Sequence, residues 1–260
     1  MYSLPAFCRC RLALPGVGLL LTISRLGHGQ ARDLDPINTG RPDQTTGTNV
    51  VPQHTLQLES GLRYQHGRTV RAYNYPTLMA RYGLFKQLEL RVSASVQDSV
   101  PVDNRRHPWG IGPPELGARL HLWQQHGLLP EAAFTAAATL PVGKEALRPS
   151  SPEARLRLGF TNSLTSKLAL TYTYGYGWLP DAREQKYALK LGATFSDRLS
   201  GYGEFFGTTT SGSSPDNEAD AGLLWLLKPN LQLDIAAGIG LSRAAPSFFV
   251  TTGFSIRLPH

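Results

Sequence analysis

The feature that most constrains this chain is a strict alternation of apolar side chains with polar or small ones, and it is clearest in residues 248–258. Side chains of a β-strand point alternately to the two faces of its sheet. One face of this stretch is apolar except for a threonine, and it comprises Phe248, Val250, Thr252, Phe254, Ile256 and Leu258. The other face is mostly small or polar and ends with Arg257. We therefore predict a strand that pairs with the first strand and closes an antiparallel barrel, which leaves no open sheet edge.

The first 31 residues have the pattern of a secretory signal peptide. Arg9 and Arg11 precede an apolar core in residues 12–23, and residues 29–31 offer small side chains near a cleavage point. Both cysteines lie in this leader, so the exported chain would carry no thiol and no disulfide. The formal net charge of +7 falls by three when the arginines of the leader are removed. The remaining charge forms no basic stripe, which argues against nucleic acid as a partner.

The same alternation recurs in twelve segments along the chain. They are residues 54–66, 75–83, 87–96, 115–123, 131–140, 155–162, 167–178, 186–195, 199–207, 220–227, 231–241 and 248–258. Beyond the leader no apolar run approaches about 18 residues, which excludes a helical membrane protein. Because twelve is an even number, the pattern predicts a single up-and-down antiparallel transmembrane β-barrel in residues 54–260. An irregular periplasmic segment in residues 32–53 leads into it.

The connections between these segments alternate between short turns and mostly longer loops. The longest are residues 97–114, 141–154 and 208–219. Outer-membrane barrels have short periplasmic turns and longer external loops. We therefore expect both termini in the periplasm and the barrel in the outer membrane of a Gram-negative bacterium. Its partners would be outer-membrane lipid and the outer-membrane insertion machinery.

Alternation alone does not show which face meets lipid, and a soluble barrel with an apolar interior or a β-sandwich remains an alternative. About eight strands enclose a space that side chains can fill, whereas twelve would enclose more. With the faces reversed in a membrane, four bases would meet lipid at a cost of roughly 2 to 4 kcal/mol each near the midplane. These bases are Arg91, Arg119, Arg157 and Lys190. We therefore place the charged face inward. Only residues 199–207 leave their two faces ambiguous.

The inward face then carries a mixture of acidic and basic side chains. The predicted lumen-lining residues are Glu59, Arg63, Arg81, Glu89, Arg91, Glu115, Arg119, Glu131, Arg155, Arg157, Lys186, Lys190, Glu204, Asp220, Asp234 and Arg257. They could line a polar path for an unidentified small solute, or they could neutralise one another in ion pairs that stiffen a nearly filled lumen. Arg41, Asp43 and Gln44 could fold into the periplasmic mouth as a plug that pairs with this lining, or belong to a flexible remnant of the leader.

Other functional classes have weaker support in the sequence. A membrane-embedded hydrolase would need a serine beside a histidine and an orienting carboxylate or amide. Neither His66 nor His121 comes with such a signature, so we expect no catalytic residue and no enzyme. The scattered histidines and the absence of cysteine after the leader predict no metal site and no cofactor. A structural or surface-interaction barrel without transport stays an alternative.

Several short motifs resemble, in order, those of the MetA-pathway of phenol degradation family of outer-membrane proteins. The motifs are RPDQT at 41–45, LQLE at 56–59, RYGL at 81–84, LPVG at 140–143, DAGL at 220–223, PNLQLD at 229–234 and GFSIRL at 253–258. They cover nearly all of the chain beyond the leader. The resemblance implies a porin-like transporter barrel that passes small, apolar or aromatic molecules.

The last strand also resembles the terminal assembly signal of outer-membrane barrels. Thr251, Gly253, Ile256 and Leu258 have the spacing polar-x-Gly-x-x-apolar-x-apolar. Aliphatic residues stand where such signals usually have aromatic ones, and two further residues follow. We expect the insertion machinery to recognise this strand.

Overall fold

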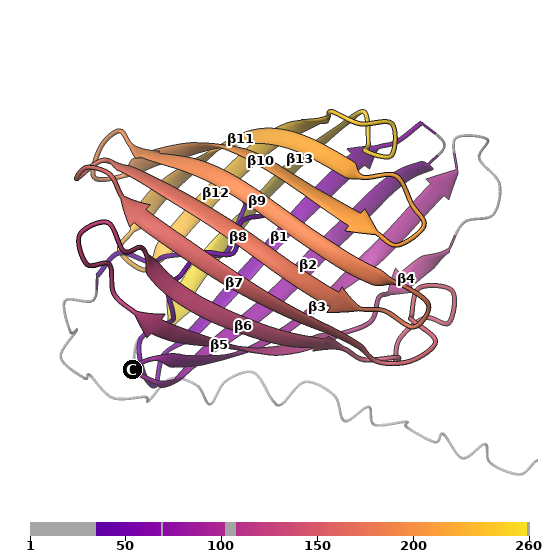
Figure 1. The fold of residues 1–260 in the computed structure, drawn as a ribbon, viewed down its shortest axis with the longest axis horizontal. Helices are drawn as coiled ribbons and strands as arrows, with labels where there is room; N and C mark the ends of the chain where they lie inside the picture. The colour runs from indigo at the N-terminus through magenta and orange to yellow at the C-terminus, as the bar shows by residue number, and fades with distance from the viewer. Residues whose placement is uncertain (1–34, 69, 102–107, 259–260) are drawn as a thin grey trace, which may run out of the picture. The chain divides into compact units, whose positions relative to one another are not determined.

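The computed structural model describes residues 35–68, 70–101 and 108–258, and within them the chain is all-β. Twelve long antiparallel strands pair in sequence order, and the last pairs with the first, so that the sheet closes into a barrel (Figure 1). The predicted twelve-stranded barrel is confirmed. The signal peptide predicted at residues 1–31 lies outside the described residues, as do residues 32–34, 69, 102–107 and 259–260.

Each predicted segment corresponds to one long strand, and β4 (Trp109–Ile111) is an extra short strand paired with β3. The long strands are β1 (Leu56–His66), β2 (Val70–Phe85), β3 (Leu88–Pro101), β5 (Glu115–Trp123), β6 (Glu131–Thr139), β7 (Glu153–Ser163), β8 (Leu168–Trp178), β9 (Arg183–Thr194), β10 (Leu199–Thr210), β11 (Asp216–Lys228), β12 (Leu231–Gly240) and β13 (Phe248–Leu258). No helix among the described residues is long and apolar enough to cross a membrane.

Several strands extend further than predicted at the end of the barrel opposite the short turns. β2 begins at Val70 and not at residue 75, and the β10–β11 connection is residues 211–215 and not 208–219. In β2 a register shift between Asn74 and Thr77 interrupts the alternation next to Pro76, which has no amide hydrogen to donate. In β11 the added residues are mostly polar on both faces, so alternation could not show that they are strand.

The barrel closes over the full length of its first and last strands. β1 and β13 pair from Leu56 with Leu258 to His66 with Phe248, without a register shift. At the inward positions Gln57 is the partner of Arg257. The predicted pairing of residues 248–258 with the first strand is thus confirmed. The segment described below is anchored at this seam between β1 and β13.

The side-chain pattern is inverted relative to that of a soluble protein. Outward positions carry large apolar side chains, among them Leu189 and Ile235, which are 48% and 53% exposed. Inward positions carry buried charges, among them Arg81 and Glu89. A soluble barrel with an apolar interior and a β-sandwich are therefore both excluded, because either would bury the apolar set and expose the charges.

The two faces of β10, which alternation left ambiguous, are distinct in the structure. Tyr202 and Phe206 are buried on the inward face, whereas Phe205 is exposed on the outward face. Phe206 joins Phe249 and Ala188 in a small apolar cluster inside the lumen, with the two phenylalanine rings 6.2 Å apart. The sequence was ambiguous here because aromatic side chains occur at both even and odd positions of this strand, so neither face stood out as the apolar one.

Candidate functional site

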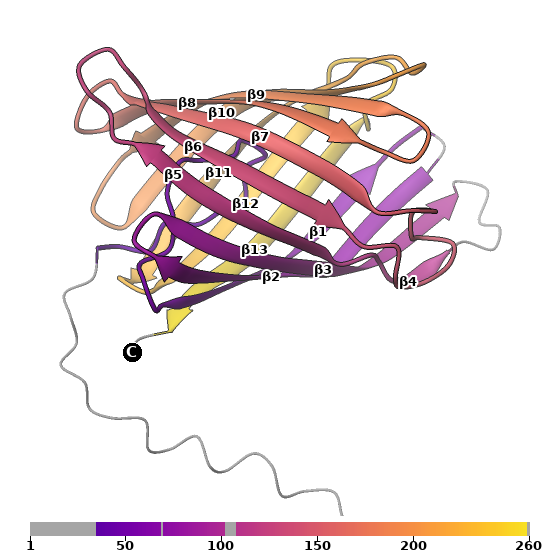
Figure 2. The same ribbon diagram turned by 60° about the horizontal axis from the view of Figure 1, so that its bottom comes forward.

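An irregular segment, residues 35–53, lies inside the barrel, and we call it the lumenal segment. Figure 2 shows it in indigo within the ring of strands. It starts beside the β11–β12 turn, where the amide of Ile37 donates to the carbonyl of Pro229 over 2.8 Å. It ends beside the β2–β3 turn, where the amide of His54 donates to the carbonyl of Gly83 over 2.7 Å. Both ends therefore lie at the short-turn end of the barrel, and the middle of the segment rises into the lumen.

Arg41, the first predicted plug residue, contacts the wall around the barrel seam. Its Nη2 donates to the hydroxyl of Thr251 and the carbonyl of Thr252, each over 3.0 Å. The same nitrogen lies 3.3 Å from Oδ1 of Asp234 on β12, and Nη1 donates to the hydroxyl of Thr77 on β2 over 3.3 Å. One guanidinium thus joins β2, β13 and β12 through the lumen.

The next residues contact a different part of the wall, formed by β9 and β10. The carboxylate of Asp43 forms an ion pair with Lys190. Glu204 accepts hydrogen bonds from the amides of Gln44 and Thr45, over 2.8 and 2.5 Å. Since β11 lies between these strands and the Arg41 contacts on β12 and β13, residues 41–45 link two separate parts of the wall.

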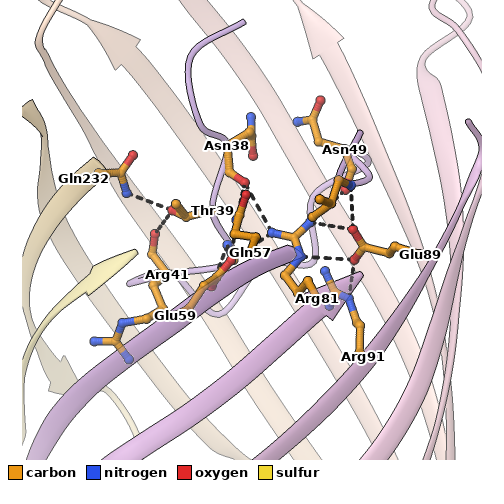
Figure 3. Close-up of polar contacts among 12 residues, drawn as sticks. Asn38, Thr39, Arg41, Asn49, Gln57, Glu59, Arg81, Glu89, Arg91 and Gln232 are labelled. Carbon is orange, nitrogen blue, oxygen red and sulfur yellow. Dashed lines mark hydrogen bonds and ion pairs between the residues drawn. The ribbon is translucent and has the colours of Figure 1, made fainter. Parts of the chain in front are cut away.

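A third set of contacts centres on Arg81, which is almost completely buried (Figure 3). Its Nη1 lies 2.9 Å from Oε1 of Glu59, and its Nη2 lies 2.9 Å from Oε2 of Glu89. The same guanidinium donates to the carbonyls of Asn38 and Asn49, over 3.2 and 3.3 Å. Arg81 therefore holds both the rising and the returning limb of the lumenal segment.

The remaining predicted lumen residues divide into paired and unpaired ones. Nη2 of Arg155 lies 2.9 Å from Oε2 of Glu153, and its Nε lies 3.0 Å from Oε1 of Glu184. Nε of Arg91 lies 2.5 Å from Oε1 of Glu89. Further contacts join Arg63 to Glu218, Arg119 to Thr135, Asp220 to Tyr202, and Arg257 to the carbonyl of Asp35. Among the described residues, no hydrogen bond or ion pair involves the side chains of Arg157, Lys186 and Glu115. Neutralising pairs and free charges therefore occur together in this lumen.

The two histidines weighed for hydrolysis have other neighbours. Nε2 of His121 lies 2.9 Å from Oε1 of Glu131, and Nδ1 of His66 lies 3.3 Å from the hydroxyl of Tyr64. Within the described part of the chain, neither imidazole ring has a hydrogen bond to a serine side chain. In the same residues, no three histidine, cysteine, aspartate or glutamate side chains form a group that could hold a metal ion.

Two polar cavities lie on opposite sides of the lumenal segment. One, of about 520 Å³, extends toward the longer loops and is lined by Gln97, Thr139 and Glu153 among others. The other, of about 350 Å³, extends toward the short turns and is lined by Lys167 and Ser200 among others. Arg41 and Asp43 line both cavities. These two side chains are therefore part of the septum between the two halves of the lumen.

Sequence reasoning missed several inward acids, namely Glu153, Glu184, Asp216 and Glu218. All four lie at strand ends that were predicted as loop. Extending the period of two from the predicted strands by two to four residues would have found them. It also missed the buried threonines of the lumenal segment, Thr45, Thr46 and Thr48, for which an irregular stretch has no periodic signal.

Residues 39–258 match the family model described as "Putative MetA-pathway of phenol degradation". The chain belongs to this family. The resemblance inferred from the short motifs is thereby confirmed. No curated protein matches the chain by sequence.

Solved structures of outer-membrane channels have a similar fold. The COG4313 outer membrane channel from Pseudomonas putida F1 is 13% identical, with a TM-score of 0.65 over 85% of this chain and 100% of that one. The KdgM porin in complex with disordered oligogalacturonate is 12% identical, with a TM-score of 0.55 over 77% and 98%. The NanC porin is 9% identical, with a TM-score of 0.54 over 78% and 100%. At these identities the similarity establishes the barrel fold of this family member.

Proposed function

We propose that this protein is an outer-membrane channel for small solutes, closed in the described state by its own lumenal segment. The observation that carries the proposal is the pair of polar cavities separated by Arg41 and Asp43. A barrel that served only as a membrane anchor would need neither cavity. The fold shared with porins and with an outer membrane channel supports the same function.

The path runs along the inward face, past the predicted set of charged residues from Glu59 to Arg257. Its solutes are small, because the larger cavity measures about 520 Å³. The family description suggests aromatic compounds, and the polar lining favours those with groups that form hydrogen bonds. The proposal gives the chain no enzymatic role. It places both termini in the periplasm, since both ends of the lumenal segment and the C-terminal end of β13 lie at the short-turn end.

Deleting residues 35–48 is expected to convert a closed barrel into one with stable open-channel current. The deletion removes Arg41, Asp43 and Gln44 and joins the two cavities. The measurement is single-channel conductance in planar lipid bilayers, with solute uptake into vesicles as a second readout. Heat-modifiable gel migration shows whether the variant has folded.

The matched control deletes residues 212–214, three exposed residues of the β10–β11 connection. This variant should keep the low current of the unmodified protein. If the folded deletion variant carried no current and took up no solute, the channel proposal would be wrong.

A further inference from the structure

The guanidinium of Arg41 occupies a notch in the wall at the seam of the barrel. Gly61 of β1 and Gly253 of β13 are register partners there. A methyl group at Gly61 would overlap the guanidinium, and one at Gly253 would lie 2.6 Å from Nε of Arg41. Two facing glycines therefore leave the space that this side chain fills.

The polar groups around the notch accept hydrogen bonds. They are the carboxylate of Asp234, the carbonyl of Thr252 and the hydroxyls of Thr77 and Thr251. The hydroxyl of Thr77 already donates its hydrogen to the carbonyl of Gly61, and the hydroxyl of Thr251 donates to the carbonyl of Leu62, each over 3.0 Å. Toward the guanidinium, each hydroxyl oxygen therefore acts only as a hydrogen-bond acceptor.

This donor and acceptor pattern selects a particular kind of cation. The guanidinium group of arginine has five N–H donors in a plane and no acceptor, which matches a notch lined by several acceptors. Oδ2 of Asp234 is buried without a hydrogen-bond partner among the described residues, so the carboxylate can accept a further N–H group. A cation without N–H groups would leave these buried acceptors unpaired, which is unfavourable.

We propose that the notch is a guanidinium-recognition site, that Arg41 is its tethered occupant, and that solutes bearing a guanidinium group open the channel by displacing Arg41. The proposal rests on the channel function given above. Arg41 borders both cavities, so its release removes one side of the septum. The Asp43–Lys190 ion pair and the Arg81 contacts then keep the rest of the segment in the barrel.

The test compares guanidinium chloride with tetramethylammonium chloride at low millimolar concentration and equal ionic strength. Both are monovalent cations, but tetramethylammonium has no N–H donor. In planar bilayers, guanidinium should raise the fraction of time that the channel is open, and tetramethylammonium should not. If both salts have the same effect on the unmodified protein, the notch does not recognise guanidinium and the proposal is overturned.

Two variants locate the effect at the notch. Arg41→Ala should be open without added guanidinium and should show no further opening when it is added. In Gly61→Ala the added methyl group occupies the notch and excludes the guanidinium of Arg41. This variant should therefore also be open without added guanidinium and show no further opening when it is added. It leaves the predicted assembly signal at Gly253 unchanged. The control is Gly203→Ala, because a methyl group there has no heavy atom within 4 Å, and this variant should respond like the unmodified protein.

The outcomes separate this inference from the channel function. If the deletion of residues 35–48 conducts while folded Arg41→Ala and Gly61→Ala stay closed, Arg41 is not part of the gate and the inference fails, but the channel function stands. If all three folded variants stay closed, both fail. Heat-modifiable migration identifies the folded protein in each case.

Discussion

Replacing Arg81 with methionine is expected to lower the free energy of unfolding of the barrel by about 3–5 kcal/mol, the usual cost of removing one partner of a buried ion pair. The side chains of Arg81, Glu59 and Glu89 are only 1%, 1% and 0% exposed. Without the guanidinium, two carboxylates stay buried with one fewer positive charge, and the carbonyls of Asn38 and Asn49 each lose a donor. Urea titration of the protein in lipid vesicles, followed by tryptophan fluorescence, measures the loss.

Arg91→Met is the matched control. Among the described residues, the side chain of Arg91 forms hydrogen bonds and ion pairs with Glu89 alone, and it is 13% exposed. Its loss should therefore cost less stability than the loss of Arg81. Combining Arg81→Met with Glu59→Gln should restore part of the lost stability, because Glu59 then carries no charge and Glu89 keeps its ion pair with Arg91. Equal stability of Arg81→Met and the unmodified protein would contradict the role assigned to Arg81.

Leu189→Arg is expected to destabilise the barrel by about 2–4 kcal/mol if this position faces the hydrocarbon core of the membrane. Leu189 lies midway along β9, points outward and is 48% exposed. In water such a position would tolerate arginine at little cost. In lipid the guanidinium has no partner and the bilayer resists its burial. The same urea titration in vesicles measures the change.

Leu128→Arg is the control for depth in the membrane. Leu128 is 97% exposed and lies in the β5–β6 connection, at the short-turn end. Arginine near the interface should cost roughly 0 to 1 kcal/mol. If the two substitutions had the same cost, the outward face would not be the lipid face.

Local periodicity was enough to predict most of the barrel. In β13 the alternation of Phe254 and Ile256 with Ser255 and Arg257 defines two faces from neighbouring residues alone, since the strand period is two. Prediction failed where local rules are interrupted. The register shift beside Pro76 exchanges the faces of β2, and residues 216–219 have no apolar face to detect. There, pairing with neighbouring strands decides what is strand.

The sequence by itself determined the number of strands, their inward and outward faces and the pairing of the last strand with the first. Only the tertiary structure decided the path of residues 35–53, because this segment has no periodic pattern and its hydrogen bonds go to distant residues. Arg41 meets Asp234 from 193 positions away, and Gln44 meets Glu204 from 160. Such contacts exist only after the strands have paired and enclosed the lumen. The notch between Gly61 and Gly253 is itself a product of that closure, since each strand contributes one of its two walls.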